Sequence, residues 1–535
     1  MSGSWTGTGS LLRLALRRDR ILLPSIVGGL ALLVIASAQA TIALYPDTDP
    51  QRLARDVAGV AGNPAFLAMY GPLADPPTLD AFAVFKTVVM GGVFLAIAVV
   101  AIVRRHTRTE EEEGRFELLG AGVVGRRAPL LAACLMAMGM VAVTCLICAA
   151  GLAGLGMDPT GTLAFALDWA ALGLVMTAVT AVAAQLTATA RGCTTIALGV
   201  LGVSFGLRAA GDAVEGAGAL SWLSPLGWML KVQPYGQNRF WVLAIPVTVA
   251  VVLFAVAARL LERRDLGAGL VAERPGPAAA GRWLGSALGL AWRLQRGSLL
   301  VWTVALLLVG VLIGSLAGSV ASMLDDPATQ DLLRRMSGSE VPDLTSLFLA
   351  AEFTFISLAV AGYGIAATLR LRGEERDLHT EPVLATATSR WIFLGSHLLI
   401  ALLGSTWLLL VLGAVVGTMR GLATGDLAGQ LPTLIGAALA PLPAVWVCVG
   451  LTTLIFGLVP RWTSGAWILL VLFLVVGEFG SLLGLPAWLQ EVSPFAHLPS
   501  LPGGSVTALP LIALAAAATV AVSTGSGGFR RRDVG

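Results

Sequence analysis

The chain alternates between long apolar runs and short polar segments. Each apolar run covers roughly 18–25 residues, which is the length that an α-helix needs to cross the hydrocarbon core of a bilayer. The runs predict twelve transmembrane helices, near residues 21–44, 81–103, 129–154, 165–188, 194–210, 239–260, 298–318, 347–369, 391–418, 433–458, 463–484 and 506–524. We therefore expect an all-α integral membrane protein.

Composition agrees with this prediction and excludes several other classes. The 535 residues are 56% hydrophobic and 13% charged, whereas soluble proteins carry about 25% charged residues. The net charge is +3 and the basic residues are spread over the loops, so no nucleic-acid-binding surface is expected. Cys145 and Cys148 form a C-x-x-C motif inside a predicted span without further ligands, and we expect no metal or redox site.

Arginine and lysine residues gather on one side of the predicted membrane. Of 35 such residues, 26 fall on the side of the N-terminus, seven on the other side, and two, Lys86 and Arg208, within spans. Because basic loops stay in the cytoplasm, both termini are predicted to be cytoplasmic. Arginine outnumbers lysine 33 to 2, which indicates a high-GC bacterial genome and hence a bacterial plasma membrane.

The chain is an internal duplication with two six-span halves, residues 1–265 and 281–535, joined by a Pro/Ala/Gly-rich linker at 266–280. An amphipathic stretch precedes each half, SLLRLALRRDR at 10–20 and SALGLAWRLQR at 286–296. We expect each to form a helix in the cytoplasmic membrane interface. The alternative is that each is only a charged flank of the span that follows it.

A charged loop after the second span of each half is also repeated. Residues 108–126, RTEEEEGRFELLGAGVVGR, align without gaps with residues 372–390, RGEERDLHTEPVLATATSR. A shorter repeat, LSPLGW at 223–228 and VSPFAH at 492–497, lies on the predicted outer side. Six positions of the longer pair are identical: Arg108/Arg372, Glu110/Glu374, Glu111/Glu375, Glu117/Glu381, Ala121/Ala385 and Arg126/Arg390.

The repeated charges predict a cytosolic extension of the second span followed by a short amphipathic helix. In the first copy this helix would present Phe116, Leu118 and Leu119, and glutamates favour the positive end of a helix dipole. We interpret the loop as a docking element for a partner protein. The alternative is a solvated acidic loop that only keeps the helix ends in water.

The chain cannot bind ATP through a P-loop of its own. That motif needs a Gly-Lys-Ser/Thr sequence, but the only two lysines, Lys86 and Lys231, follow Phe85 and Leu230. If ATP drives this protein, a separate subunit hydrolyses it.

With its two-times-six architecture, its repeated interfacial helix, its E-E-x-x-G-R-F-E-L-L loop and its S-P-L-G-W segment, the sequence resembles the permeases of ATP-binding-cassette (ABC) exporters. It is most similar to fused actinobacterial permeases of the tetronasin and polyketide-antibiotic exporter type. The resemblance implies a type-2 ABC exporter fold in which the loop after the second span of each half is a coupling helix seated on an ATPase.

The resemblance also implies the coupling residues and the partners. They are, in the first copy, Arg108, Glu110, Glu111, Arg115, Phe116, Glu117 and Arg126, and in the second, Arg372, Glu374, Glu375, Glu381 and Arg390. The second copy departs from the first at Leu378, His379 and Pro382, so its contact is expected to be weaker or differently angled. One chain would bind two ATPase subunits, which bind ATP and Mg²⁺, and would itself hold no cofactor and no catalytic residue.

Four ionisable residues fall inside predicted spans at similar depth near the outer edge. Lys86 and Arg208 lie in spans 2 and 5 of the first half, and Glu352 and Glu478 lie in the same spans of the second. Charges within a membrane are usually functional, and the resemblance implies that spans 2 and 5 line the central pathway. We predict an outer gate closed by ion pairs between the halves. The alternative is that each group snorkels to the headgroups.

Aromatic residues in the same spans are a candidate lining for a substrate cavity: Phe85, Phe94, Phe205, Phe353, Phe355 and Tyr363. The alternative is ordinary helix packing. We expect an exporter that extrudes hydrophobic or amphiphilic small molecules such as antibiotics. Two other functions stay open: a proton-coupled drug antiporter, and a membrane protein that transmits ATPase motion without transport. Neither a mid-membrane carboxylate nor a large outer domain, which these would need, is apparent in the sequence.

Overall fold

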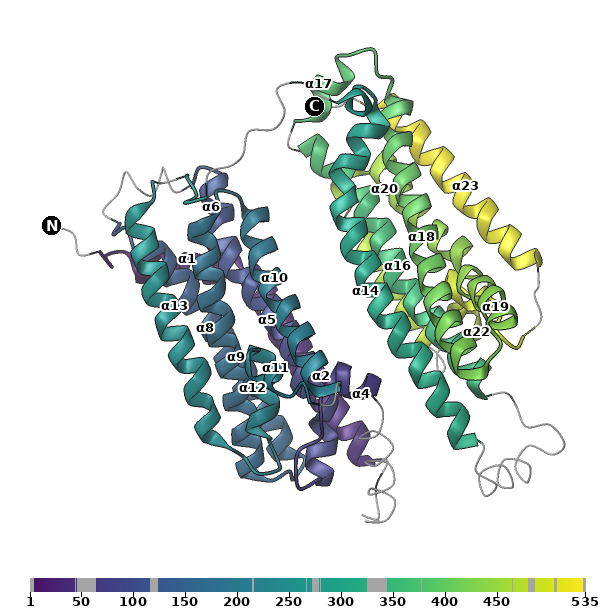
Figure 1. Ribbon diagram of the computed structural model, residues 1–535. Helices are drawn as coiled ribbons and strands as arrows, with labels where there is room; N and C mark the ends of the chain where they lie inside the picture. Colours follow the sequence, from purple (N-terminus) through teal and green to yellow (C-terminus); the bar gives the residue numbers. More distant parts are fainter. Residues whose placement is uncertain are drawn as a thin grey trace. The chain divides into compact units, whose positions relative to one another are not determined.

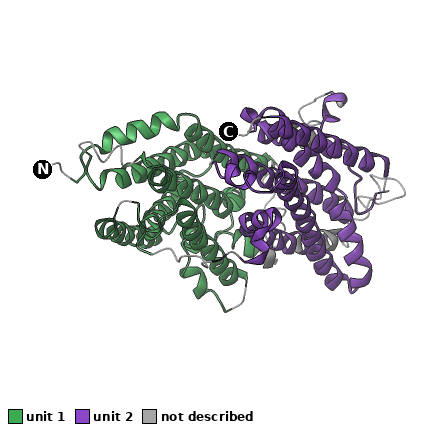
Figure 2. Ribbon diagram, turned by 90° about the horizontal axis from the view of Figure 1, so that it is seen from above, with its two compact units in different colours: residues 1–276 green, residues 277–535 purple. Residues whose placement is uncertain are grey.

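The computed structural model divides into two compact units, Met1–Gly276 and Pro277–Gly535 (Figure 2). The boundary falls within the expected linker, residues 266–280. The structure describes residues 4–43, 45, 64–115, 124–213, 216–265, 267–271, 279, 281–324, 344–376, 378–463, 465–479, 486–504 and 508–532.

Unit 1 is a bundle of long helices with short helices at its two ends (Figure 1). Its long helices are α2 (Leu22–Ala43), α5 (Leu79–Arg104), α8 (Ala128–Gly154), α9 (Pro159–Leu186), α10 (Ala190–Ala213) and α13 (Ala244–Arg263). Its short helices are α1 (Thr8–Arg18), α4 (Pro64–Tyr70), η1 (Arg105–Thr109), α6 (Glu110–Glu112), α11 (Ala219–Trp222), α12 (Pro225–Val232) and η2 (Phe240–Leu243).

Unit 2 repeats this order with local differences. Its long helices are α14 (Ala287–Leu324), α16 (Leu344–Arg376), α18 (Arg390–Thr424), α19 (Leu427–Leu439) with α20 (Leu442–Leu458), α21 (Gly465–Phe479) and α23 (Ala508–Arg531). Its short helices are η3 (Arg282–Gly285), α17 (Thr380–Leu384), η4 (Pro460–Trp462), α22 (Ala487–Gln490) and η5 (Pro494–His497).

Each of the twelve predicted spans coincides with a helix. Within the described residues, eleven helices are long and apolar enough to cross a membrane, which confirms an all-α, multi-pass membrane protein. The exception is α21, whose described part has 15 residues, because residues 480–484 of the predicted span lie outside the described part. The tenth span is divided, since α19 ends at Leu439 and α20 begins at Leu442.

The two amphipathic stretches differ in structure. In unit 1 the stretch forms a separate helix, α1, which ends before Asp19, so a distinct helix is confirmed there. In unit 2 the stretch is continuous with the following span in the 38-residue helix α14, so the expectation of a separate helix was wrong. The alternative, a flank of the following span, describes the second half.

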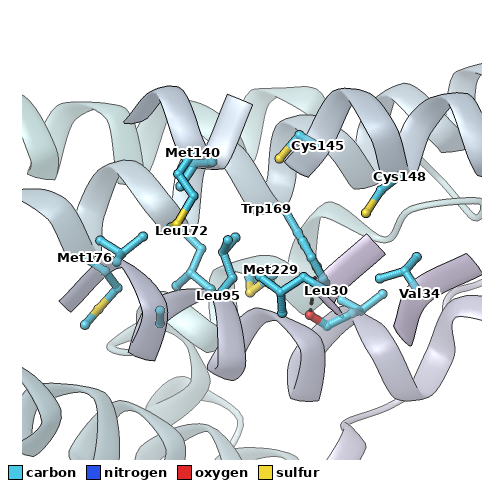
Figure 3. Close-up of a cluster of buried hydrophobic side chains, with 14 of the residues drawn as sticks. Leu30, Val34, Leu95, Met140, Cys145, Cys148, Trp169, Leu172, Met176 and Met229 are labelled. Atoms are coloured by element: carbon cyan, nitrogen blue, oxygen red, sulfur yellow. Dashed lines mark hydrogen bonds between the residues drawn. The ribbon is translucent and has the colours of Figure 1, made fainter. Parts of the chain in front are cut away.

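The core of unit 1 gathers side chains from α2, α5, α8, α9 and α12 (Figure 3). Trp169 of α9 is fully buried, and its indole N–H donates to the carbonyl of Val88 on α5 at 3.2 Å. Gly91 lies against the same indole, where a Cβ would come within 2.6 Å of the ring. A lipid-embedded bundle has no hydrophobic driving force between its helices, so such close, small-against-large packing holds the helices together.

The short outer repeat occupies equivalent positions in both units. The hydroxyl of Ser224 donates to the carbonyl of Ser204 at 2.6 Å, and that of Ser493 donates to the carbonyl of Phe473 at 3.3 Å. Both serines are completely buried. Each therefore fixes the turn before a short helix, α12 or η5, against the preceding long helix, α10 or α21.

Asp168 lies deeper than its expected place at the start of the fourth span. The helix α9 begins at Pro159, where the carboxylate of Asp158 accepts the N–H of Gly161 at 2.7 Å. Helix initiation at this capping residue places Asp168 more than two turns inside the helix, where its side chain is buried. The helix therefore begins before residue 165, the predicted start of the fourth span.

Close packing between α20 and α23 requires glycine, which has no Cβ, at position 525. A second glycine on α23 provides a matched control for testing this requirement. A Cβ on Gly525 would lie 2.4 Å from the carbonyl oxygen of Thr453, whereas a Cβ on Gly527, on the same helix, would meet nothing within 4 Å. We expect Gly525→Ala to destabilise the protein by about 1–3 kcal/mol through overpacking.

Gly527→Ala serves as the control and is expected to leave stability unchanged or raised by up to about 1 kcal/mol, since alanine favours a helix. The measurement is thermal unfolding of the detergent-purified protein with a thiol-reactive dye, because all five cysteines are buried and free. Equal midpoints for the two variants would contradict this account of the helix pair.

Candidate functional site

The repeated charged loops lie at corresponding ends of their units, beside α1 in unit 1 and beside the C-terminus in unit 2 (Figure 1). Helix α5 does not stop at Arg104 but continues through the π-helical turn η1 into α6. Helix α16 continues to Arg376 and is followed by the short helix α17. The predicted extension is thus present in both copies, and the short helix in the second. Phe116, Glu117, Leu118 and Leu119 lie outside the described residues.

Glu111 points into unit 1 and is held by two arginines. Its side chain is 4% exposed. The guanidinium of Arg264, which follows α13, donates to both carboxylate oxygens at 2.7 and 3.0 Å. Arg108, three residues earlier, lies 3.1 Å away, and the N–H of Gly267 donates at 2.7 Å. The carboxylate is therefore satisfied within its own half.

Glu375 also lies between two arginines in unit 2. Arg372, three residues earlier on α16, lies 3.0 Å from the carboxylate, and Arg532, which follows α23, lies 2.8 Å from it. The Glu375 side chain is 8% exposed. Both units thus bury one glutamate between an arginine of the second span and an arginine that follows the sixth.

Arg126 and Arg390, the last identical pair of the two loops, both bind the end of the sixth span's helix. The guanidinium of Arg126 donates to the carbonyl of Arg264. That of Arg390 donates to the carbonyls of Arg530 at 3.0 Å and Arg532 at 2.7 Å. Cationic side chains at a helix C-terminus satisfy carbonyls that have no partner within the helix. The start of span 3 is therefore attached to the end of span 6 in each half.

Arg264 and Arg532 were not among the predicted site residues, although the sequence carries a signal for them. Residues 261–267 read LERRDLG and residues 529–535 read FRRRDVG, with Arg263/Arg531, Arg264/Arg532 and Asp265/Asp533 identical at a common offset of 268. The segments follow the sixth span of each half. A search of the span ends for repeats would have found them.

The remaining loop charges are more exposed. In unit 1, Glu112 and Glu113 are exposed, and Arg115 is 43% exposed. Glu110 is mostly covered by its contacts with Arg18 of α1 and with Arg115. In unit 2, Arg376, His379 and Glu381 are exposed, whereas Glu374 is buried beside Arg370 at 2.8 Å. The surface charges, not the repeated buried ones, are free for another protein to reach.

The end of the amphipathic stretch is anchored differently in the two units. Asp19 is buried and binds His106 at 2.7 Å and Arg105 at 3.0 Å, both at the end of the second span. The corresponding residue in the repeat, Gln295, is buried and contacts His397 of the third span at 3.0 Å. Among the described residues, the stretch is attached to the charged loop in unit 1, where Arg18 binds Glu110, and to the third span in unit 2.

The four predicted gate residues have different surroundings. Lys86 is exposed and Glu352 half-buried, and neither forms an ion pair with a described residue. The side chain of Glu478 lies outside what the structure describes. Arg208 is fully buried in unit 1, where it donates to the carbonyls of Ala68 at 2.6 Å and Met69 at 3.1 Å, at the end of α4. Arg208 thus has a local partner, and an ion pair between the halves stays a prediction.

The six predicted cavity aromatics have different surroundings within their own units. Phe94 and Phe355 are about half exposed, whereas Phe353 and Tyr363 are buried in the core of unit 2. Phe85 is buried against Tyr70, with ring centroids 5.5 Å apart, and Phe205 packs under the guanidinium of Arg208 at 4.5 Å. A shared role in substrate binding stays a prediction.

Comparison with known proteins gives a full-length match. The sequence model of the family described as "Multidrug efflux system permease Rv1217c, C-terminal domain" matches residues 10–260 and again residues 284–530. The multidrug efflux system permease protein Rv1217c of Mycobacterium tuberculosis is 45% identical over 536 residues, which cover 99% of this chain and 96% of that protein.

A second similarity is shorter. The macrolide export ATP-binding/permease protein MacB of Marinobacter nauticus is 28% identical over 116 residues, which are 22% of this chain and 17% of that protein.

The different surroundings of Arg208 and Lys86 predict different effects on stability. Arg208→Gln removes a buried cation that holds the end of α4 and lies 3.8 Å from Asp212, so we expect a loss of about 3 kcal/mol. Lys86→Gln changes an exposed side chain and should stay within about 0.5 kcal/mol. Thermal unfolding of the two purified variants measures the difference, and similar midpoints would refute the local role of Arg208.

Proposed function

The chain belongs to the family of the multidrug efflux system permease Rv1217c, and we propose that it is the membrane subunit of an ATP-driven ABC exporter. It extrudes hydrophobic or amphiphilic small molecules, such as antibiotics, across the bacterial plasma membrane. The observation that carries the proposal is the repeated loop region, in which each six-span half holds one buried glutamate between two arginines. The match of one family model to each half supports it.

The energy comes from ATP that a separate subunit binds and hydrolyses with Mg²⁺. This chain has no lysine placed for a P-loop, and it acts as a transport subunit without a nucleotide site or cofactor of its own. Since each half carries a loop region, one chain binds two ATPase subunits. Both termini and both loops face the cytoplasm, as the arginine distribution predicts.

We propose two roles for the loop charges, which differ in burial. Exposed groups, including Glu112 and Glu113 in the first half and Glu381 in the second, form the docking surface. Glu111 and Glu375 are buried and hold the loop on its own half. The two docking surfaces differ in sequence at Leu378 and His379, so the two ATPase contacts are unequal.

On the outer side, we propose that Lys86, Glu352 and Glu478 contribute to a gate that closes by ion pairing. The supporting observation is that neither Lys86 nor Glu352 has an ion-pair partner among the described residues of its own half. Arg208 contributes indirectly by holding α4.

The docking role predicts selective loss of complex formation. Glu112→Gln combined with Glu113→Gln removes two exposed charges, and we expect the ATPase subunit to co-purify at a level reduced by ~5-fold or more, as for charges at an interface with complementary potential. Glu262→Gln is the control, because Glu262 is also exposed and lies in the last turn of α13, where it binds Arg127. It should leave co-purification unchanged. Retention of the complex by the double variant would refute this docking surface.

The gate predicts rescue by a second charge reversal. Lys86→Glu and Glu352→Lys should each reduce ATP-dependent dye uptake into inside-out vesicles by ~5-fold or more, and the double reversal should restore it, since each single change juxtaposes like charges. Independent, additive defects would contradict the ion pair. A protonophore should leave the wild-type uptake intact, whereas a proton-driven antiporter would lose it.

A further inference from the structure

Building on the proposed function, we propose that Arg264 and Arg532 are positioning residues of the transport cycle. Each attaches the loop extension of its own half to the ends of spans 4 and 6, so that displacement of the loop by the ATPase moves three spans together. Neither residue belongs to the exposed docking surface, since Arg264 is 7% and Arg532 16% exposed.

In the first half, the guanidinium of Arg264 reaches three helices at once. It follows α13, donates in a bidentate manner to Glu111 at 2.7 and 3.0 Å, and donates through Nε to the side-chain carbonyl of Gln185 at 2.7 Å. Gln185 lies in the last turn of α9 and is buried. The planar fork of arginine can hold two partners in fixed directions, which a lysine cannot do.

Arg108 reinforces the same junction from the other side. It is completely buried, and its guanidinium donates to the carbonyl of Ala184 on α9 and to the carbonyl of Ala268 at 3.3 Å. Two further backbone bonds join the segment after α13 to α9: Leu270 donates to Gln185 at 3.2 Å and Val271 donates to Leu186 at 2.9 Å. The ends of spans 2, 4 and 6 therefore form one connected polar cluster.

In the second half, Arg532 joins the same three spans with different chemistry. It donates to Glu375 of α16 at 2.8–2.9 Å. Its guanidinium carbon lies 4.7 Å from the ring centroid of Phe456 on α20 and 5.2 Å from that of Phe529 on α23. Arg532 therefore contacts span 4 through a cation–π interaction, whereas Arg264 contacts span 4 through a hydrogen bond. The ion pair to the loop glutamate is the same in both halves, and the type of contact to span 4 differs.

The burial of these charges makes the junction resistant to separation. A carboxylate or guanidinium that loses its partner in a buried site retains the cost of desolvation without the compensating interaction. Separating the span ends would leave Glu111 or Glu375 without its arginine partner, which costs free energy. The ends of spans 2, 4 and 6 in each half are therefore expected to move together and not to slide past one another. The ATPase would therefore act on spans 4 and 6 through the loop without touching them.

The test uses the full chain with its ATPase subunit in lipid vesicles. Arg264→Gln and Arg532→Gln remove the junction, and the neighbouring, exposed Arg263→Gln and Arg531→Gln are matched controls in the same repeated motif. We expect the junction variants to keep ATPase co-purification within ~2-fold of wild type but to lose ~10-fold or more of transport per ATP hydrolysed. The controls should retain both.

A double-mutant cycle identifies the pairing. If Arg264 acts through Glu111, then Glu111→Gln combined with Arg264→Gln should impair transport no more than the worse single change, because interacting residues are not additive. The corresponding cycle for Arg532 and Glu375 should give the same result. Additive losses would overturn the assignment.

Gln185→Leu removes the hydrogen bond between Arg264 and span 4 and keeps the ion pair to Glu111, so it serves if the arginine variants fail to fold. We expect transport per ATP to fall by ~3-fold or more while ATPase co-purification stays within ~2-fold of wild type. Normal coupling in Gln185→Leu and in Arg264→Lys would overturn the inference. A wild-type protein that neither binds nor stimulates the ATPase would instead refute the proposed function itself.

Discussion

A buried carboxylate held between two arginines stabilises the end of each half that carries the charged loop. Glu111 and Glu375 are tied to Arg264 and Arg532 at 2.7 and 2.8 Å, and Arg126 and Arg390 bind the same helix ends. Because a buried ion cannot be left without its partner at low cost, this arrangement determines where the loop leaves the bundle. The exposed charges beside it can then meet another protein at a defined place.

Within the membrane a different constraint governs the fold. Lipid tails are as apolar as the helix surfaces, so helices associate through close packing and internal hydrogen bonds. Gly91 against Trp169, and Gly525 against the backbone of Thr453, show this packing in each unit. Polar side chains inside the bundles bind carbonyls, as Ser224 and Ser493 do on the predicted outer side. Both halves use close glycine packing and hydrogen bonds to backbone carbonyls, because both must hold apolar helices together in lipid.

The halves have also diverged where the duplication leaves freedom. Asp19 anchors its stretch to the second span through His106, whereas Gln295 contacts His397 of the third. Arg264 forms a hydrogen bond with Gln185, whereas the equivalent Arg532 lies over the aromatic ring of Phe456. A single ATPase type acting on both halves would therefore meet two loops that respond differently. Unequal response is compatible with a permease that moves varied hydrophobic molecules, which need no symmetric site.

The apolar runs by themselves determined the helical class and predicted twelve spans, because the bilayer imposes one length and one hydropathy on every crossing segment. The repeated charged and amphipathic segments indicated the duplication. Repeated charges located the loop region, but sequence could not tell that Glu111 and Glu375 point inward while Glu112 and Glu113 stay exposed. Neither could it show that Arg208 holds α4 or that α14 continues through its amphipathic stretch. A charge pattern records which groups are present, whereas their partners lie about 150 residues away in the chain. Only tertiary packing decides which of those partners a buried charge can reach.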